Sequence, residues 1–136
     1  MIQEPCWPLR FSHQQLPVGY FADPTLAEQP LFARALDGEA VAQLWQAPQG
    51  FVVPGSYRKF AELPAVSEQF AGQGWPVWQR RSGGGLVPQG PGIVNLSLAW
   101  PVYHSLGEAA EPIYLFLCGL LQRTLATFGV ASHCRA

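Results

Sequence analysis

The chain has 136 residues, of which 49% are hydrophobic and 12% are charged, and its formal net charge at pH 7 is -1. This length suits one domain with a single hydrophobic core, and the composition is that of a globular chain, not a disordered one. The near-neutral charge excludes the basic surface of a typical nucleic-acid-binding protein, and no apolar run reaches the roughly 18 residues of a membrane span. We therefore expect neither nucleic acid nor a membrane as a partner.

Two features of the sequence favour a cytoplasmic location. Residues 1–10 contain acid and proline where a secretory signal would have a basic region and an apolar core. The three cysteines, Cys6, Cys118 and Cys134, form no CxxC pair, which favours reduced thiols over a disulfide or zinc framework.

The first predicted elements are a short strand over 7–11 and a helix over 23–36. The helix opens with an Asp-Pro pair, which places an N-cap side chain before a proline in the first turn. Pro30 should bend or divide the helix, because proline lacks the N–H that a helix interior needs. The Asp-Gly pair at 37–38 predicts its end.

Short elements follow in the middle of the chain. Residues 41–46 alternate apolar and polar side chains, which predicts a strand with Val41, Leu44 and Trp45 as candidates for the core. Three further elements are predicted: a strand over 51–53, a short amphipathic helix over 66–70 and a strand over 76–79.

The clearest strand covers residues 93–100. Its alternation produces two faces, one with Val94, Leu96, Leu98 and Trp100 and the other with Ile93, Asn95, Ser97 and Ala99. We predict that the first face packs in the core, with Leu96 buried. The second face has two small polar side chains, so we predict that it borders a ligand, with Asn95 facing the site.

The clearest helix is predicted to open at Glu111-Pro112 and to stop near Gly129. Its apolar residues follow the i, i+3, i+4 spacing of a buried stripe: Ile113, Phe116, Leu117, Leu120, Leu121, Leu125 and Phe128. The mixed order of strands and helices, with short connections, predicts an α+β fold with a mixed, largely antiparallel sheet and flanking helices.

Residues 79–87 read Gln-Arg-Arg-Ser-Gly-Gly-Gly-Leu-Val and lie between two predicted strands. The glycines allow backbone N–H groups to approach an anion, and Arg80 and Arg81 supply planar donors for phosphate or carboxylate. The chain has no acidic residue between Glu68 and Glu108, so the segment is locally positive. A glycine-rich hairpin tip with solvated arginines is the structural alternative. The segment does not match the GxxxxGK[ST] or GxGxxG nucleotide loops.

The same segment resembles a motif of the lipoate–protein ligase and octanoyltransferase family. That motif has two arginines, a spacer, Ser or Thr, three glycines, any residue and Val. In this register Arg80 matches the second arginine and Arg81 the spacer. The hydroxyl residue, the three glycines and the valine of the motif are matched by Ser82, Gly83, Gly84, Gly85 and Val87. Residues 92–97, Gly-Ile-Val-Asn-Leu-Ser, resemble a later G-x-x-N-x-S element of the family. The resemblance covers about residues 18–130.

This resemblance implies a biotin/lipoate ligase-like catalytic domain. We expect residues 1–136 to be a single, incomplete domain, the N-terminal portion of a longer one, because the chain stops where another strand would be expected. The resemblance also implies a set of residues that bind the acyl chain or the acyl-adenylate. These are Arg80, Ser82, Gly83, Gly84, Gly85, Val87, Gln89, Asn95 and Ser97.

Several positions depart from the family pattern. Gln79 stands where the first arginine is usual, Gln89-Gly90 where His-Asp is common, and Ser56 and Arg58 where Arg and Gln are usual. The family's reactive lysine, or the cysteine of the transferase branch, lies in a later segment. Lys59 is upstream of the motif and matches neither, so we expect the catalytic Lys or Cys to lie beyond this chain.

The implied function is attachment of lipoate or octanoate to a carrier-protein lysine. A ligase would use ATP and Mg²⁺ through an acyl-adenylate, and a transferase would take octanoate from acyl carrier protein. The implied partners are the lipoyl-carrier domain of a 2-oxoacid dehydrogenase or a glycine-cleavage protein. Because the sheet is expected to be incomplete, we also expect its open edge to pair with a second chain or with the missing half of the domain. The alternative function is a non-catalytic acyl- or partner-binding module of the same fold.

The other candidate functional residues are less well supported by the sequence around them. His13, His104 and His133 are scattered without partners at metal-ligand spacing, which predicts structural or surface roles. Cys134 has basic neighbours in sequence, so a nucleophilic thiol is a minor hypothesis. Trp75, Trp78 and Trp100 lie near the glycine segment and are candidates for the wall of an acyl tunnel.

Overall fold

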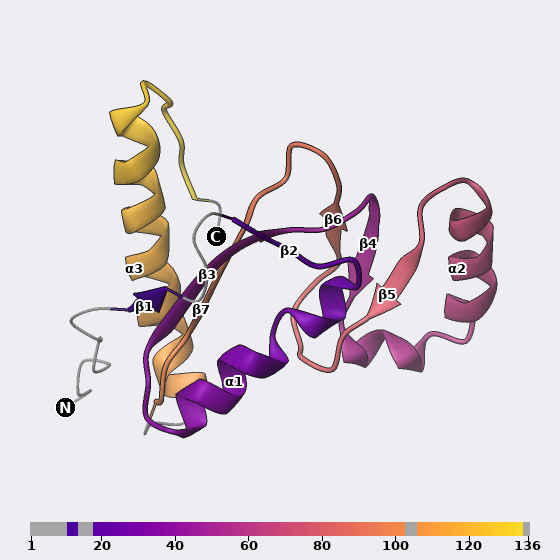
Figure 1. The fold of residues 1–136 in the computed structure, drawn as a ribbon, viewed down its shortest axis with the longest axis horizontal. Coiled ribbons are helices and arrows are strands. Elements are labelled where there is room, and N and C mark those ends of the chain that lie inside the picture. The colour runs from indigo at the N-terminus through magenta and orange to yellow at the C-terminus, as the bar shows by residue number, and fades with distance from the viewer. Residues whose placement is uncertain (1–10, 14–17, 103–105, 135–136) are drawn as a thin grey trace. The chain divides into compact units, whose positions relative to one another are not determined.

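The structure is a computed structural model, and it describes residues 11–13, 18–102 and 106–134 (Figure 1). These residues divide into two compact units, one within residues 10–101 and the other within residues 102–136. The first unit contains the motif segment and both sheets, so it contains all nine residues of the predicted binding site.

The larger sheet of the first unit is built around β3 (Val41–Gln46). On one edge β3 pairs antiparallel with β7 (Asn95–Ala99), in a register that runs from Val41 opposite Ala99 to Trp45 opposite Asn95. On the other edge it pairs in parallel with two short strands, β1 (Ser12–His13) and β2 (Gly19–Tyr20). The expected mixed sheet is confirmed, and its longest ladder is antiparallel (Figure 1).

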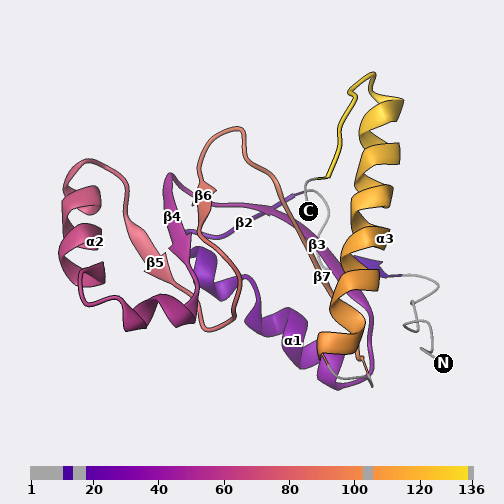
Figure 2. The same cartoon turned by 180° about the vertical axis from the view of Figure 1, so that it is seen from behind.

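A second, smaller sheet has β4 (Gly50–Val53) at its centre. This strand pairs in parallel with β5 (Val77–Gln79) and antiparallel with β6 (Val87–Gln89), so the sheet is also mixed. Helix α2 (Leu63–Gly72) contacts β5, as the reverse view shows (Figure 2). The Phe51 ring packs between this helix and the following loop, with ring centroids 5.5 Å from Phe70 and 5.0 Å from Trp75.

The turn into β4 requires a glycine. A Cβ atom on Gly50 would lie 2.3 Å from Trp78 Cζ3 and 2.5 Å from the carbonyl oxygen of Pro76. Contacts this short are repulsive, and the second partner is backbone that cannot rotate away. Gly50 therefore allows β4 and β5 to pair closely at this end of the smaller sheet.

The predicted helix over 23–36 is divided, as Pro30 led us to expect. It consists of a 3-10 turn η1 (Pro24–Leu26) and helix α1 (Gln29–Leu36), with Pro30 in the first turn of α1. The Asp23 side chain accepts a hydrogen bond from the Thr25 backbone N–H at 2.9 Å, which is the predicted cap. The helix ends before Gly38, whose φ of 90° is readily adopted by glycine.

Helix α1 packs against β3 and β7 and forms the core of the first unit (Figure 1). One buried cluster contains Leu31, Val41 and Ala99. A second contains Ala27, Trp45 and Ala47, and the Phe21 ring meets Trp45 edge-on at 5.7 Å. The prediction that Val41 and Trp45 point inward is confirmed, whereas Leu44 is half-buried.

The prediction that the face of β7 with Leu96 packs in the core, with Leu96 buried, is wrong. Leu96 is 46% exposed and Val94 is 55% exposed, whereas Ala99 on the opposite face is buried against α1. The alternation of the two faces is as predicted, but α1 covers the face with the small residues. Small side chains there leave room for the helix and, at Asn95 and Ser97, for a pocket.

This orientation changes the expected cost of truncating side chains in the sheet. Val41→Ala should lower the free energy of unfolding by about 2–3 kcal/mol, because the side chain is fully buried. Leu96→Ala should cost about 1 kcal/mol or less, because the side chain is half-exposed. Urea denaturation of both variants, followed by circular dichroism, measures the two costs. A larger cost for Leu96→Ala would mean that its face is the covered one.

The second unit contains helix α3 (Leu106–Thr127). Its predicted start at Glu111 is wrong: the helix begins at Leu106, and Pro112 lies inside it. A proline in the second turn removes one hydrogen bond, and the Ala and Glu residues before it are good helix formers. The helix stops as predicted, with Gly129 at a φ of 76°. Most of the predicted stripe is exposed, including Phe116, Leu121 and Phe128.

Of the remaining strands and helices, some were predicted correctly and others were not. The strands over 41–46, 51–53 and 76–79 are present as β3, β4 and β5, and α2 is longer than the predicted 66–70. Strand β6 was not predicted, and the strand over 7–11 falls almost entirely outside the described residues. Within the described ranges, no helix has the length and hydropathy that a membrane crossing requires.

Candidate ligand-binding pocket

A pocket of about 180 Å³ lies in the first unit where its two sheets approach η1 and α1. The larger sheet contributes side chains from β3 and β7, and the smaller sheet contributes side chains from β4 and β6. The lining residues are Pro24, Ala27, Glu28, Trp45, Val52, Arg80, Val87, Gln89, Asn95 and Ser97. Most of the lining surface is apolar, and five of the ten lining residues supply polar or charged groups. Apolar walls with polar groups among them are typical of small-molecule sites.

A network of polar side chains forms one side of the pocket. Gln89 is 3% exposed, and its amide group exchanges two hydrogen bonds with Asn95, at 3.0 and 2.8 Å. Asn95 also donates to the carbonyl of Trp45 at 3.3 Å, and the Trp45 indole N–H donates to Ser97 Oγ at 2.9 Å. Because buried polar groups satisfied in this way resist rearrangement, this side of the pocket is preorganised.

Arg80 organises the glycine-rich loop. Its Nη2 donates to the carbonyl oxygens of Gly83 and Gly85, both at 2.8 Å, so the loop curls around the guanidinium. Gly84 lies between them at a φ of 106°, and a Cβ there would be 3.0 Å from Arg80 Nη2. The arginine therefore both lines the pocket and holds the loop, and a larger residue at Gly84 would strain both.

A carboxylate reaches the same pocket from the start of α1. Glu28 Oε1 accepts a hydrogen bond from Ser82 Oγ at 2.7 Å, across 54 residues of sequence. Glu28 Oε2 is buried and has no hydrogen-bond partner among the described residues. Because Glu28 and Arg80 line one pocket, the site has both a negative and a positive group.

The lipoyl protein ligase A/B catalytic domain is the family whose sequence pattern matches this chain, over residues 23–135. The chain belongs to this family. It is also similar to an uncharacterized protein of Cupriavidus necator, with 47% identity over 115 residues, which are 85% of this chain and 46% of that protein. The chain therefore spans about half the length of the curated relative that it matches.

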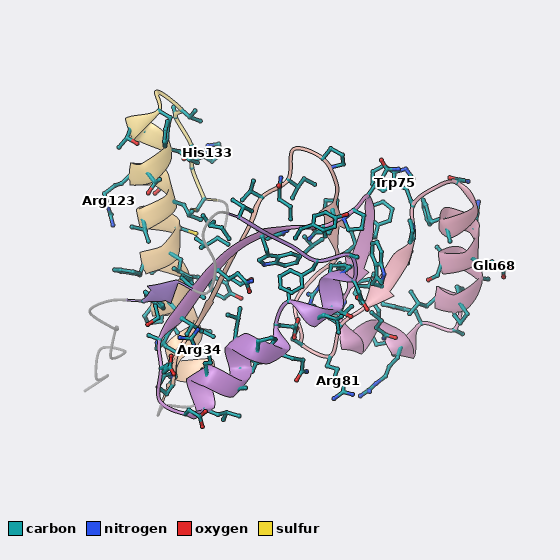
Figure 3. All side chains as sticks on the ribbon, in the orientation of Figure 1. Arg34, Glu68, Trp75, Arg81, Arg123 and His133 are labelled. Atoms are coloured by element: carbon teal, nitrogen blue, oxygen red, sulfur yellow. The ribbon has the colours of Figure 1, made fainter. Side chains whose placement is uncertain are left out.

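Five of the nine site residues expected for this lipoyl ligase family line the pocket: Arg80, Val87, Gln89, Asn95 and Ser97. Ser82 is joined to the pocket through its hydrogen bond to Glu28. The glycines Gly83, Gly84 and Gly85 are exposed and do not line it; two of them contribute carbonyls that Arg80 holds. Arg81 is exposed, and its side chain extends away from the ribbon (Figure 3). Ligand binding by these residues stays a prediction.

The remaining five residues that line the pocket were not predicted from the sequence as site residues. Among the tryptophans, Trp45 lines the pocket, whereas Trp75 stacks on Phe51 and Trp100 meets Phe11 edge-on at 5.6 Å. Glu28 was missed too, although it follows the predicted Asp-Pro helix start by only a few residues. No local motif marks it, because its place in the pocket depends on how α1 packs.

None of the reactive side chains considered from the sequence that the structure describes lines the pocket. Lys59 is exposed on the 3-10 turn η2 (Gly55–Lys59), with Nζ 5.2 Å from the centre of the Phe60 ring. A hydrogen bond with Cys118 raises the pKa of the Cys134 thiol, which disfavours the thiolate that a nucleophile needs. His133 is exposed (Figure 3), and the other two histidine side chains lie outside what the structure describes. Across the described ranges, no three His, Cys, Asp or Glu residues are grouped as metal ligands.

Proposed function

We propose that this protein acts in attaching octanoate or lipoate to a lysine of a carrier protein. The observation that carries the proposal is the pocket at the family motif. There, apolar walls suited to an acyl chain lie beside the guanidinium of Arg80, which suits a carbonyl oxygen, a carboxylate or a phosphate. Family membership supports the same reaction class.

The size of the pocket favours the acyl part of the substrate. At about 180 Å³ it is smaller than the roughly 300–1,000 Å³ of pockets that enclose drug-sized ligands. It therefore suits a short aliphatic chain with its polar head better than a whole acyl-adenylate. Trp45, Val52 and Val87 supply apolar contacts for such a chain.

In the proposed reaction the lysine nitrogen forms an amide bond to the acyl carbon and releases one proton. The bond that breaks joins this carbon to the phosphate oxygen of AMP in a ligase, or to a thioester sulfur in a transferase. A ligase would form the adenylate first with ATP and Mg²⁺. We propose that the reaction takes place in the cytoplasm, on a 2-oxoacid dehydrogenase or glycine-cleavage carrier, with a catalytic Lys or Cys from a later segment.

One observation favours a second candidate, a binding module without catalytic activity. Gln89 and Gly90 occupy positions where the family commonly has His and Asp. The Gln89 amide is buried and hydrogen-bonded to Asn95, so it supplies no titratable group to the pocket. Such a module would bind an acyl chain or a partner without transferring it.

Weighing the carrier after reaction tests the proposal. The product of the natural gene is incubated with an apo carrier domain in two reactions. The first contains ATP, Mg²⁺ and octanoate or lipoate, and the second contains octanoyl–acyl carrier protein. We expect an acylated carrier in one of them, and the productive reaction identifies ligase or transferase. We expect the 136-residue chain alone to leave the carrier unmodified in both, because none of its candidate nucleophiles lines the pocket.

The controls separate the two candidates. An authentic lipoate ligase in parallel establishes that the carrier is competent. If this control acylates the carrier and the natural gene product does not in either reaction, the binding module is the correct function. Acylation by the 136-residue chain as a monomer would refute our placement of the nucleophile in a later segment.

A further inference from the structure

A group of exposed cations lies on the first unit outside the pocket. Arg58 and Lys59 are on η2, and Arg81 follows β5; all three side chains are exposed. Together with Arg80 they are four of the eight lysines and arginines of a chain whose formal net charge at pH 7 is -1. The positive charge of the protein is therefore concentrated in two short segments.

The smaller sheet brings these two segments together. Strands β4 and β5 run in parallel, with Val53 opposite Gln79, so the residues after each strand leave the sheet at the same end. The backbone N–H of Gly55 donates to the carbonyl of Ser82 at 3.1 Å, and the Gln79 amide donates to the carbonyl of Gly55 at 3.2 Å. A Cβ atom on Gly55 would lie 2.9 Å from the carbonyl oxygen of Arg81, so the segments are in direct contact. We call the three exposed cations on these segments the basic patch: Arg58, Lys59 and Arg81.

The charges of the basic patch are not neutralised within the chain. Among the described residues, none of the three cations forms an ion pair. The sequence has no acidic residue between Glu39 and Glu62 or between Glu68 and Glu108, so both segments are free of acid. Glu62, at the start of α2, is exposed and pairs with none of the three. A cluster of like charges creates a positive potential that attracts a partner of opposite charge.

The basic patch lies beside the pocket in the chain. Arg80 lines the pocket, and Arg81, the next residue, extends away from the ribbon (Figure 3). Phe60 directly follows η2 and is 45% exposed, so it adds an aromatic side chain to this surface. Arginine and aromatic side chains are enriched at protein interfaces. A protein that contacts the patch would therefore be held next to the loop that Arg80 organises.

We propose that the basic patch docks an acidic face of the carrier protein and so presents its acceptor lysine to the acyl group. The inference rests on the proposed function and concerns recognition of the carrier. At about 180 Å³ the pocket is filled by the acyl chain and its head, so the carrier has to be recognised outside it. A nucleic acid fits less well, because three cations on a chain of net charge -1 do not form an extended basic surface.

Charge reversal tests this docking without requiring catalysis. Apo carrier domains of a 2-oxoacid dehydrogenase and of a glycine-cleavage protein are immobilised in turn. Biolayer interferometry then measures the rate constant with which the product of the natural gene associates with each. The variants are Arg58→Glu, Lys59→Glu and Arg81→Glu. Arg123→Glu is the control, because it makes the same change of net charge at an exposed residue of α3, in the other unit (Figure 3).

We expect each reversal to slow association with a carrier by about three- to ten-fold, because it replaces attraction with repulsion, and Arg123→Glu to leave the rate unchanged. Raising the salt concentration from about 0.05 M to about 0.5 M should slow the unaltered protein more than the reversal variants. Octanoate affinity, measured by calorimetry, should be the same in all of them.

Four results would overturn the inference. They are no binding of either carrier by the unaltered protein, unchanged association in the three reversal variants, equal slowing by Arg123→Glu, and a loss of octanoate affinity in the reversal variants. The third would mean that net charge alone acts, and the fourth that the patch serves a small anion.

Two further comparisons keep the test decisive. If a reversal variant does not fold, as judged by circular dichroism, the salt dependence of the unaltered protein decides, because a rate that does not change with salt excludes docking guided by charge. Carrier acylation is measured separately. Docking that depends on the patch without acylation would contradict the proposed reaction alone, whereas acylation with unchanged docking in the reversal variants would contradict only the role of the patch.

Discussion

Trp45→Ala is expected to lower the free energy of unfolding by about 3–5 kcal/mol, the range for removing a buried large aromatic side chain. Trp45 is 8% exposed and packs with Ala27, Ala47 and the Phe21 ring. Its indole N–H also donates to Ser97 Oγ, so the substitution removes both packing and a hydrogen bond. Urea denaturation monitored by far-ultraviolet circular dichroism measures this cost.

Trp45→Phe is the matched variant for this prediction. It keeps an aromatic ring against Phe21 but removes the indole N–H that Ser97 accepts, so we expect a cost of about 1–2 kcal/mol. The pocket wall should remain in place, and binding of octanoate should change less than in the alanine variant. A cost for Trp45→Ala near that of an exposed residue would show that the two sheets do not depend on this side chain.

Arg80→Ala is expected to weaken binding of a non-hydrolysable lipoyl-adenylate analogue by about 1.5–3 kcal/mol, the value of a hydrogen bond with a charged partner. The structure adds a second effect to this direct one. Without the guanidinium, the carbonyls of Gly83 and Gly85 lose their donor, so the loop should become more mobile. Calorimetry measures affinity, and amide hydrogen exchange over residues 82–86 measures the loop.

Two further substitutions serve as comparisons for Arg80→Ala. Arg80→Lys keeps the positive charge but lacks the planar fork, so it should restore part of the affinity and little of the loop protection. Arg81→Ala should change neither quantity, because Arg81 is exposed and extends away from the ribbon (Figure 3). Unchanged affinity in Arg80→Ala would remove Arg80 from the binding site and leave it a structural role.

The sequence was most informative where local chemistry decides the structure. The cap at Asp23, the division of the helix near Pro30 and the end at Gly38 follow from dihedral and hydrogen-bonding preferences of single residues. The strand β3 follows from its alternation. The motif at 80–87 identified the family without any knowledge of the fold, because its residue types and spacing are specific.

Long-range packing decided the rest. Alternation along β7 separates its two faces, but it cannot say which one a helix covers, and α1 covers the face with Ala99. The acid-free window between Glu68 and Glu108 predicted only that the motif segment is locally positive. The fold also brings Glu28 to Ser82 from 54 residues away. Residue types and their spacing thus determined the family and the local elements, whereas the composition of the pocket depended on contacts between segments far apart in sequence, which no local preference encodes.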